Sequence, residues 1–211
     1  MVDSPVVTVH GEASREVPPE LAQFSVTVQA RDKDRQAALA RLAERAAAVR
    51  VLIEEYTDAV ERRETGALQV RPELKRSGER VVAYNGRVTT TVTVTDFTVL
   101  GELMLRLADQ DQVEISGPWW SLRPESRAAV EVRQAAVRDA IERGREYAGA
   151  LGARVTALLE LADEGGADQP LMMARAGFSM GEAPELELDP QPQTVRAAVR
   201  ARFAISEPDL G

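Results

Sequence analysis

The segment from Val81 to Leu107 changes its hydrophobic period in the middle, and this change constrains the fold more than any other part of the sequence. Val88, Val92 and Val94 alternate with polar neighbours, which is the pattern of a strand with one buried face. The Asp96 carboxylate can then accept hydrogen bonds from the first turn of a helix. Beyond it the apolar residues recur at helical spacing, at Leu100, Leu103, Met104 and Leu107. The segment therefore predicts a strand that leads directly into a capped amphipathic helix.

The rest of the chain repeats these two patterns. Alternation predicts further strands around residues 7–9, 24–28, 67–74, 113–122, 155–161 and 195–205, and helical spacing predicts helices over 39–56, 97–109 and 129–151. The predicted fold class is α+β, with antiparallel strands in one or two curved sheets and three helices packed on them. The predicted order is β-β-α-β-β-α-β-α-β, then a long excursion and a final β.

Three connections carry specific predictions. The runs at 7–9 and 24–28, separated by Pro18-Pro19, are predicted to pair with each other. The turn of the next strand pair is placed at Ser77-Gly78, which makes Asn85-Gly86 a bulge or kink instead of a hairpin turn. Pro124 is placed in the first turn of the third helix.

Residues 163–193 differ in character from the rest of the chain. They contain four glycines, four prolines, three methionines and an acidic cluster at Glu182, Glu185, Glu187 and Asp189. This composition predicts a long irregular excursion. Because the strand after it must pair with strands formed earlier in the chain, residues 1–211 are predicted to form a single domain.

Composition excludes several classes of function. The 211 residues include no cysteine, which excludes disulfides, thiolate catalysis and sulfur-ligated metals. The net charge of −8, with basic residues dispersed among acidic ones, argues against nucleic acid and anionic membranes as partners. No apolar run reaches the roughly 18 residues of a membrane span. The N-terminal residues lack the features of a leader, which predicts a cytoplasmic protein, or a periplasmic or cell-envelope one if a leader has been removed.

Gly177 to Gly181 matches the G-x-S-x-G motif of serine hydrolases, with Ser179 in the nucleophile position. That chemistry needs a histidine after the serine, and the single histidine, His10, lies far upstream. Pro184 and Pro190 also interrupt the helix that should follow. We therefore interpret the match as a coincidence, and a serine hydrolase as the least favoured function.

Other polar candidates have simple structural interpretations. His10 is placed at an exposed strand position, because one histidine cannot build a histidine metal site. Asp109 to Glu114 resembles a calcium loop but lacks its central glycine and distant glutamate, which favours a helix-to-strand connection. The acidic cluster is interpreted as a solvated rim, with cation or small-ligand binding at 182–189 as the alternative function. No cofactor is predicted.

The interface candidates are aromatic, flexible or arginine-bearing. Trp119 and Trp120 are adjacent on a strand, so one side chain should be buried and the other should face outward, with Trp120 taken as the first to mutate. The excursion adds adaptable methionines. The last strand presents arginines on one face. The full set is Trp119, Trp120, Met172, Met173, Met180, Arg196, Arg200 and Arg202.

Taken in order, several motifs resemble the SIMPL-domain family of bacterial proteins. They are Val7-Thr8-Val9-His10-Gly11, Pro18-Pro19-Glu20-Leu21-Ala22 and Val26-Thr27-Val28, followed by the Tyr84 strand that ends at Asp96, the Ala-rich helix through Ala136–Ala140 and Ala148–Gly152, and the strand from Val195 to Ile205. Glu20 stands where the family usually has aspartate.

The resemblance implies an exported protein without a known catalytic residue. Some members are linked to stress responses, and some assemble into large ring-like or channel-like oligomers. The predicted function is accordingly a non-enzymatic scaffold or interaction module that forms homo-oligomers or binds a protein partner.

Overall fold

The computed structural model describes residues 5–75, 78, 80–165 and 186–210. Two antiparallel sheets and three helices confirm the predicted α+β class, and the strands and helices follow the predicted order. The chain divides into two compact units, one from Met1–Pro18, Leu122–Arg175 and Pro192–Gly211, the other from Pro19–Ser121 and Ala176–Gln191. The single domain over residues 1–211 stays a prediction.

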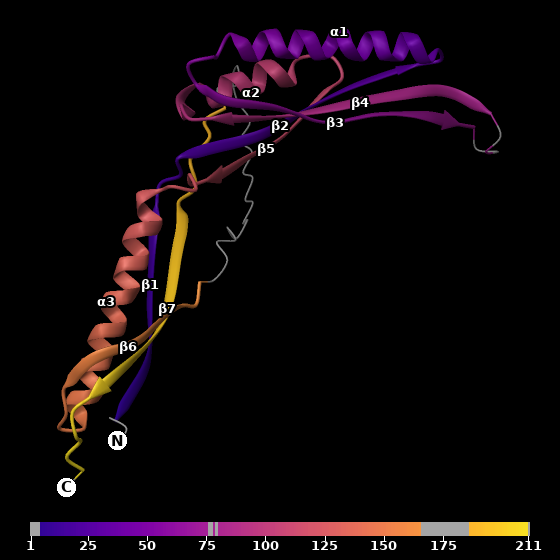
Figure 1. Ribbon diagram of the computed structural model, residues 1–211. Coiled ribbons are helices and arrows are strands. Elements are labelled where there is room, and N and C mark those ends of the chain that lie inside the picture. Colours follow the sequence, from indigo (N-terminus) through magenta and orange to yellow (C-terminus); the bar gives the residue numbers. More distant parts are fainter. Residues whose placement is uncertain (1–4, 76–77, 79, 166–185, 211) are drawn as a thin grey trace. The chain divides into compact units, whose positions relative to one another are not determined.

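The second unit is a four-stranded sheet with two helices on one face (Figure 1). The strands lie in the order β3-β4-β2-β5, with bounds β2 (Leu21–Asp32), β3 (Val60–Leu74), β4 (Val81–Val94) and β5 (Val113–Ser121). The helices are α1 (Arg35–Glu54) and α2 (Leu100–Ala108), the latter preceded by a 3-10 turn, η1 (Phe97–Val99). The core under them includes Phe24, Val26, Val92, Leu100, Leu103 and Leu107.

Capping and side-chain contacts fix the two helices of this unit. Asp34 caps α1, because its carboxylate accepts from the Ala37 N–H at 2.8 Å. After the end of α1, the Tyr56 hydroxyl donates to Glu102 at 2.6 Å and accepts from Arg106 at 2.8 Å, which links the two helices. Burial of the phenol raises the pKa of Tyr56, so this group stays protonated at neutral pH.

The hairpin of β3 and β4 turns at the predicted place, between Lys75 and Arg80. The predicted bulge at Asn85-Gly86 is wrong, since β4 pairs without interruption with both neighbouring strands at these residues. Gly86 contributes to packing instead. A Cβ there would lie 3.0 Å from the Leu42 side chain of α1, so Gly86 lets the helix pack directly on the strand.

The first unit is a three-stranded sheet with one helix along it (Figure 1). Its strands lie in the order β1-β7-β6, with bounds β1 (Val6–Val17), β6 (Val155–Asp163) and β7 (Gln193–Ile205), and the helix is α3 (Arg127–Ala150). The core consists of small and medium side chains from these elements: Val9, Ala136, Ala140, Val199, Ala201 and Phe203.

Close backbone approach explains why this core is built from small residues. A Cβ at Gly11 of β1 would lie 2.6 Å from the Ala140 Cβ, and closer still to the Ala136 carbonyl oxygen. On the next turn of the helix, a Cβ at Gly144 would lie 2.8 Å from the Phe203 ring. Glycine on both partners therefore lets α3 lie almost in contact with the sheet backbone.

Two further sequence predictions about local structure are wrong. β1 does not pair with β2: β1 pairs with β7, whereas β2 pairs with β4 and β5. Pro124 lies in a turn before α3, which begins at Arg127. Tyr147 of α3 is 59% exposed, because the small side chains on the adjacent face of the helix are the ones that meet the sheet. Alternation identifies a strand but says nothing about its partner.

We expect Asp96→Ala to lower the free energy of unfolding by about 1 kcal/mol at pH 7, the usual cost of a lost cap. The Asp96 carboxylate accepts from the Thr98 hydroxyl at 2.6 Å and the Thr98 N–H at 3.0 Å. These bonds lower the pKa of Asp96, so the cap stabilises the fold above the ordinary aspartate pKa of about 3.9 and loses its effect as the pH falls further. Urea titrations at pH 7 and pH 3 measure this: the difference between variant and wild type should shrink at the lower pH, and an unchanged difference would contradict the cap.

Candidate interface surfaces

The two tryptophans face opposite sides of β5, as the strand geometry predicts. Trp120 is half-buried on the helix side, where its ring meets Phe97 edge-on at a centroid distance of 4.9 Å. Trp119 is 37% exposed on the other side, across from Gln23 of β2. The outward tryptophan is therefore Trp119, whereas Trp120 belongs to the packing of the second unit.

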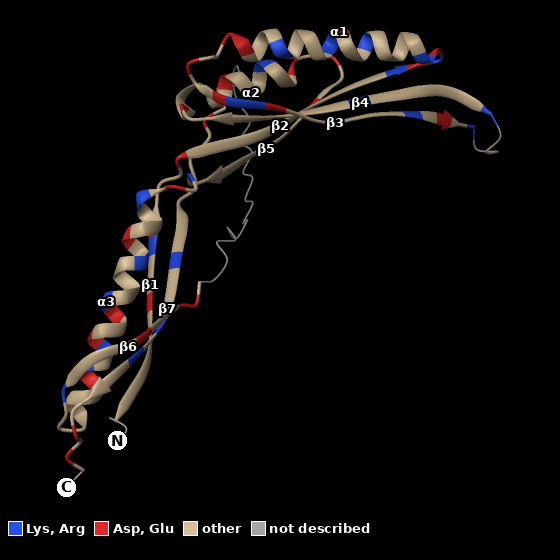
Figure 2. Ribbon diagram, viewed as in Figure 1, with Lys and Arg blue, Asp and Glu red and all other residues tan. Residues whose placement is uncertain are grey.

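The arginines of the last strand lie on the face of the three-stranded sheet opposite α3. Arg196, Arg200 and Arg202 are exposed and alternate with less exposed residues of β7, and Figure 2 shows basic residues along this strand. Arg202 pairs with Glu160 at 3.1 Å and Arg200 with Glu164 at 3.5 Å. Two of the three predicted interface arginines are thus engaged within their own unit.

His10 joins this charged face from β1. Its side chain is 58% exposed, as predicted, and Nδ1 lies 2.8 Å from the Glu164 carboxylate that also pairs with Arg200. Residues directly opposite in the register, such as His10 and Arg200, share one face of the sheet. The arrangement is a solvent-exposed ion-pair cluster that links β1, β7 and the residues after β6.

Several candidates lie outside the described residues. These are Met172, Met173, Met180, the motif around Ser179, and the acidic Glu182 and Glu185. Glu187 and Asp189 are described and exposed, and the part of the chain that the structure describes contains no group of three or more metal-ligating side chains.

The loop from Asp109 to Glu114 is a helix-to-strand connection, as predicted, because it joins α2 to β5. Asp111 contacts the Arg45 guanidinium, and Glu114 accepts from the Gln29 amide at 3.2 Å. Both carboxylates are therefore engaged by side chains of the second unit.

Three of the four free sheet edges carry features that discourage strand pairing. The β3 edge carries consecutive charged residues, among them Arg62, Arg63 and Glu64. On the β1 edge, the Glu12 N–H is already taken by the Asp139 carboxylate at 2.9 Å. The β5 edge contains Gly117-Pro118, and its register with β2 is interrupted there. Charge, covering side chains and irregular backbone are the devices by which native proteins protect such edges.

The β6 edge also has register shifts, but it is apolar, and none of the described residues covers it. Leu158 is 54% exposed, Leu159 53% and Leu161 47%. Leu158 lies opposite Phe203 in the register and Leu161 opposite Ala201, so both point to the α3 side of the sheet. The helix lies over β1 and β7, so these leucines are left open to solvent, and β6 has few charged residues (Figure 2).

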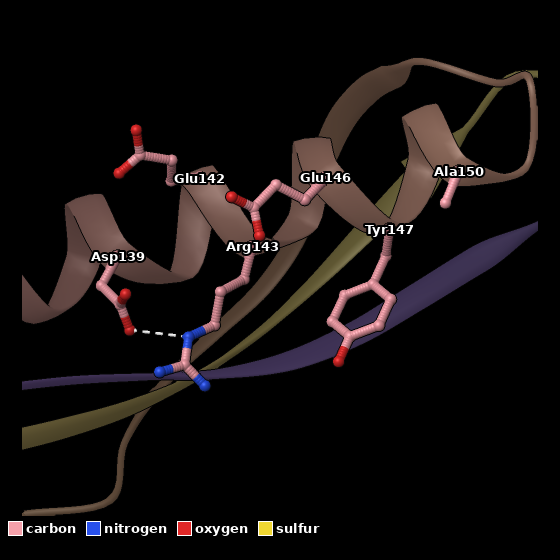
Figure 3. A pocket seen from close by; sticks show the side chains of 6 residues that line it. All are labelled: Asp139, Glu142, Arg143, Glu146, Tyr147 and Ala150. Atoms are coloured by element: carbon pink, nitrogen blue, oxygen red, sulfur yellow. Dashed lines mark ion pairs between the residues drawn. The ribbon is translucent and has the colours of Figure 1, made fainter.

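A hollow of about 570 Å³ lies along α3. Figure 3 shows that Arg143 and Tyr147 point to the same side of the helix, whereas Glu142 points to the opposite side. Asp139 is paired with Arg143 at 2.9 Å. The lining offers carboxylates, a phenol and a neutralised guanidinium, which suit contact with a polar or cationic group and supply no nucleophile–base pair.

The sequence predicted the β6 strand but missed its exposure. Alternation of Val155, Ala157, Leu159 and Leu161 in the sequence indicates a strand with one buried face. The structure shows a register shift between Leu158 and Glu160, so Leu159 is an extra residue in the strand. The adjacent leucines at 158 and 159 were the available signal, because two consecutive apolar residues do not fit a strand with only one buried face.

No helix in the described ranges combines the length and apolar character that a membrane crossing requires.

Comparisons with known proteins give a match to one family and a weak similarity to a solved structure. The model of a family described as SIMPL, Protein of unknown function (DUF541), matches residues 7–203. A comparison with curated proteins finds no match. A solved structure of a putative amidohydrolase/peptidase from Burkholderia cenocepacia is similar with a TM-score of 0.32 and 20% identity, covering 64% of this chain and 35% of that one. The chain thus spans about a third of that protein's length.

Proposed function

This chain belongs to the SIMPL family of proteins of unknown function (DUF541), and from that premise we propose that it is a non-enzymatic interaction module that assembles with copies of itself through the free edge of β6. The observation that carries the proposal is the row of exposed leucines on that edge, Leu158, Leu159 and Leu161. An exposed apolar edge strand is a template for pairing with another chain.

The contrast between the four edges supports this choice of surface. Both sheets end in long strands with free N–H and C=O groups, but β1 has an N–H bound by a carboxylate, β3 carries a run of charges and β5 contains a proline. The register of β6 also shifts, beside Thr156 and Leu159, but its edge carries exposed leucines instead of these protecting features. Within β6, the charged residues are Glu160, which is paired with Arg202, and the terminal Asp163. A partner strand on β6 therefore meets apolar side chains and no unpaired charge in the middle of the strand.

A second copy of the same strand is the partner that fits these features. Two β6 edges that pair antiparallel about a two-fold axis join two three-stranded sheets into one of six strands. Leucines of both copies then cover one another on the α3 side of the sheet, over β6, where the helix does not reach. Such pairing uses backbone hydrogen bonds for affinity and the side chains for register.

We expect the wild-type protein to form a discrete oligomer. We expect Leu159→Lys to raise the dissociation constant of that oligomer at least tenfold. A lysine at the centre of the edge places a strongly hydrated charge where two apolar strands meet, and tenfold corresponds to about 1.4 kcal/mol. Light scattering on a sizing column over a range of concentrations measures the mass of each form against the 23.0 kDa of one chain.

Leu68→Lys is the matched control for this experiment. Leu68 is 62% exposed on the charged β3 edge, so the same chemical change there should leave the mass unchanged. Circular dichroism establishes that both variants are folded. A wild-type monomer at every concentration, or equal effects of the two substitutions, would contradict assembly through β6.

The non-enzymatic part of the proposal has its own test at Ser179. A fluorophosphonate probe reacts with an activated serine, and we expect it to leave this protein unlabelled. Labelling that disappears in Ser179→Ala would overturn the proposal in favour of a serine hydrolase.

A further inference from the structure

The face of the four-stranded sheet opposite the helices contains a hollow of about 360 Å³. Its side chains form two rows across three strands. In one row Arg87 of β4 lies between Gln29 of β2 and Gln69 of β3, and in the next row Asn85 lies between Arg31 and Arg71. Gln112, just before β5, completes the polar lining. Three guanidinium groups and four amides therefore point to one side of the sheet.

One of the three arginines is neutralised by a neighbour. Arg31 makes a two-pronged contact with Glu73, at 2.7 Å from Nε and 3.0 Å from a terminal nitrogen. The Asn85 amide donates to the same carboxylate at 3.1 Å. These donors lower the pKa of Glu73, so the carboxylate is charged at neutral pH and belongs to Arg31. Glu73 is thus unavailable to compensate the other two cations.

Arg71 and Arg87 have no carboxylate partner among the described residues. They are diagonal neighbours on adjacent strands, because Arg71 lies opposite Asn85, two residues before Arg87. Diagonal neighbours are about 7–8 Å apart at the backbone, within reach of each other's long side chains. Two like charges at this distance disfavour each other, and an anion held between them removes that repulsion.

The surrounding segment has a charge opposite to that of the rest of the chain. Residues 69–87 contain five Lys or Arg and two Asp or Glu, a net charge of +3, so the remainder of the −8 chain carries −11. Within the described hollow itself, Arg71 and Arg87 are the cations that can attract an anion.

The amide groups narrow the kind of anion. Guanidinium forks match the oxygens of phosphate and carboxylate groups, whereas the amides of Gln69 and Gln112 can donate to and accept from hydroxyl groups. Gln112 also has a positive φ of 58°, a conformation that residues other than glycine adopt rarely, and it is held by the Gln29 N–H, which donates to its carbonyl oxygen at 2.9 Å.

We propose that this hollow binds a polyhydroxylated anion, a sugar that carries a phosphate or carboxylate group, with Arg71 and Arg87 on the anionic group and the neighbouring amides on the hydroxyls. The volume is within the range of small-ligand sites. The site lies in the second unit, away in the sequence from β6, so it goes beyond the proposed assembly function and is tested independently of it.

Titration calorimetry with defined probes tests the proposal. Glucose 6-phosphate and glucuronate combine both chemistries, whereas glucose and inorganic phosphate each offer one. We expect at least one of the two sugar anions to bind tenfold or more tightly than glucose and than inorganic phosphate. An oligogalacturonate as a further probe separates the two sources of such a group: tighter binding of the oligomer identifies a polymer, and equal binding identifies a free sugar.

Substitutions locate the binding. We expect Arg87→Gln and Arg71→Gln each to lower the affinity for the sugar anion at least tenfold. Arg62→Gln should leave its affinity unchanged, since Arg62 lies on the same strand as Arg71 but is paired with Glu64 at 3.3 Å. Circular dichroism checks that the variants fold.

Several results would overturn the proposal. Inorganic phosphate that binds as tightly as the sugar anions would remove the role of the amides. No binding of either sugar anion would reject the site. A polyglutamate peptide that binds more tightly than every sugar probe would reassign the hollow to an acidic protein segment.

Discussion

Replacing Gly11 by valine is expected to lower the free energy of unfolding by about 3 kcal/mol or more, because the new side chain has no room between β1 and α3. A Cβ at this position meets the backbone and Cβ of Ala140 at 2.5 and 2.6 Å, and backbone atoms cannot rotate away as a flexible side chain can. Valine gains at most about 1 kcal/mol from its preference for strands, so the steric cost decides the sign.

Gly149→Ala is the matched control for this prediction. Gly149 lies in the last turn of α3, the same helix that packs against Gly11. A Cβ placed on Gly149 would have no neighbouring heavy atom within 4 Å. Alanine in a helix interior should raise stability by roughly 0.5–1 kcal/mol relative to glycine. Urea titration followed by circular dichroism measures both variants. A Gly11→Val protein as stable as the wild type would show that helix and strand do not approach as closely as described.

Phe24→Ala is expected to cost about 3–5 kcal/mol, the usual loss for a fully buried phenylalanine. Phe24 is 0% exposed on the helix side of β2, opposite Val92 of β4. The chain also packs against its backbone from β5, since a Cβ at Gly117 would lie 2.9 Å from the Phe24 Cβ. With neighbours fixed on both strands and helices above, the core cannot collapse to fill the space that the ring leaves.

The adjacent residue provides the control. Ser25 is half-buried on the opposite face of the same strand, so Ser25→Ala should change the free energy of unfolding by less than about 0.5 kcal/mol. Urea titration gives the difference between the two variants. Equal losses at residues 24 and 25 would mean that the four-stranded sheet does not bury one face as assigned.

The sequence was informative wherever local chemistry decides the outcome. The period change at Asp96 marks the end of β4 and the cap of the next turn. Gly152 follows the Leu151 cap of α3 and has a positive φ of 68°, the conformation for which glycine is favoured at that position. Buried Val92 and Val94 lie on the face that alternation indicated. These features depend on residues within a few positions of one another, which a single sequence displays directly.

Pairing partners and surface exposure could not be obtained in the same way. The alternation in β1 is compatible with pairing to either β2 or β7. The observed pairing goes together with the close contact between Gly11 and α3, whose residues lie more than 120 positions away in the sequence. The arginine hollow was missed for a related reason. Arg31, Arg71 and Arg87 are scattered along the sequence and come together only through the register of three strands.

The pairing of β1 with β7 has a consequence for the order in which the chain can fold during synthesis. Val6 pairs with Ala204, so β1 cannot pair until β7 has been synthesised, after every other described strand. The strands and helices of the second unit all lie between residues 21 and 121, so that sheet can form while the ribosome is still adding the rest. Until β7 emerges, the apolar residues of β1 have no sheet to join. The nascent protein therefore carries a folded second unit and an unpaired β1 at the same time. We expect the apolar residues of β1 to be most exposed to aggregation, and to chaperone binding, in the time before β7 is synthesised.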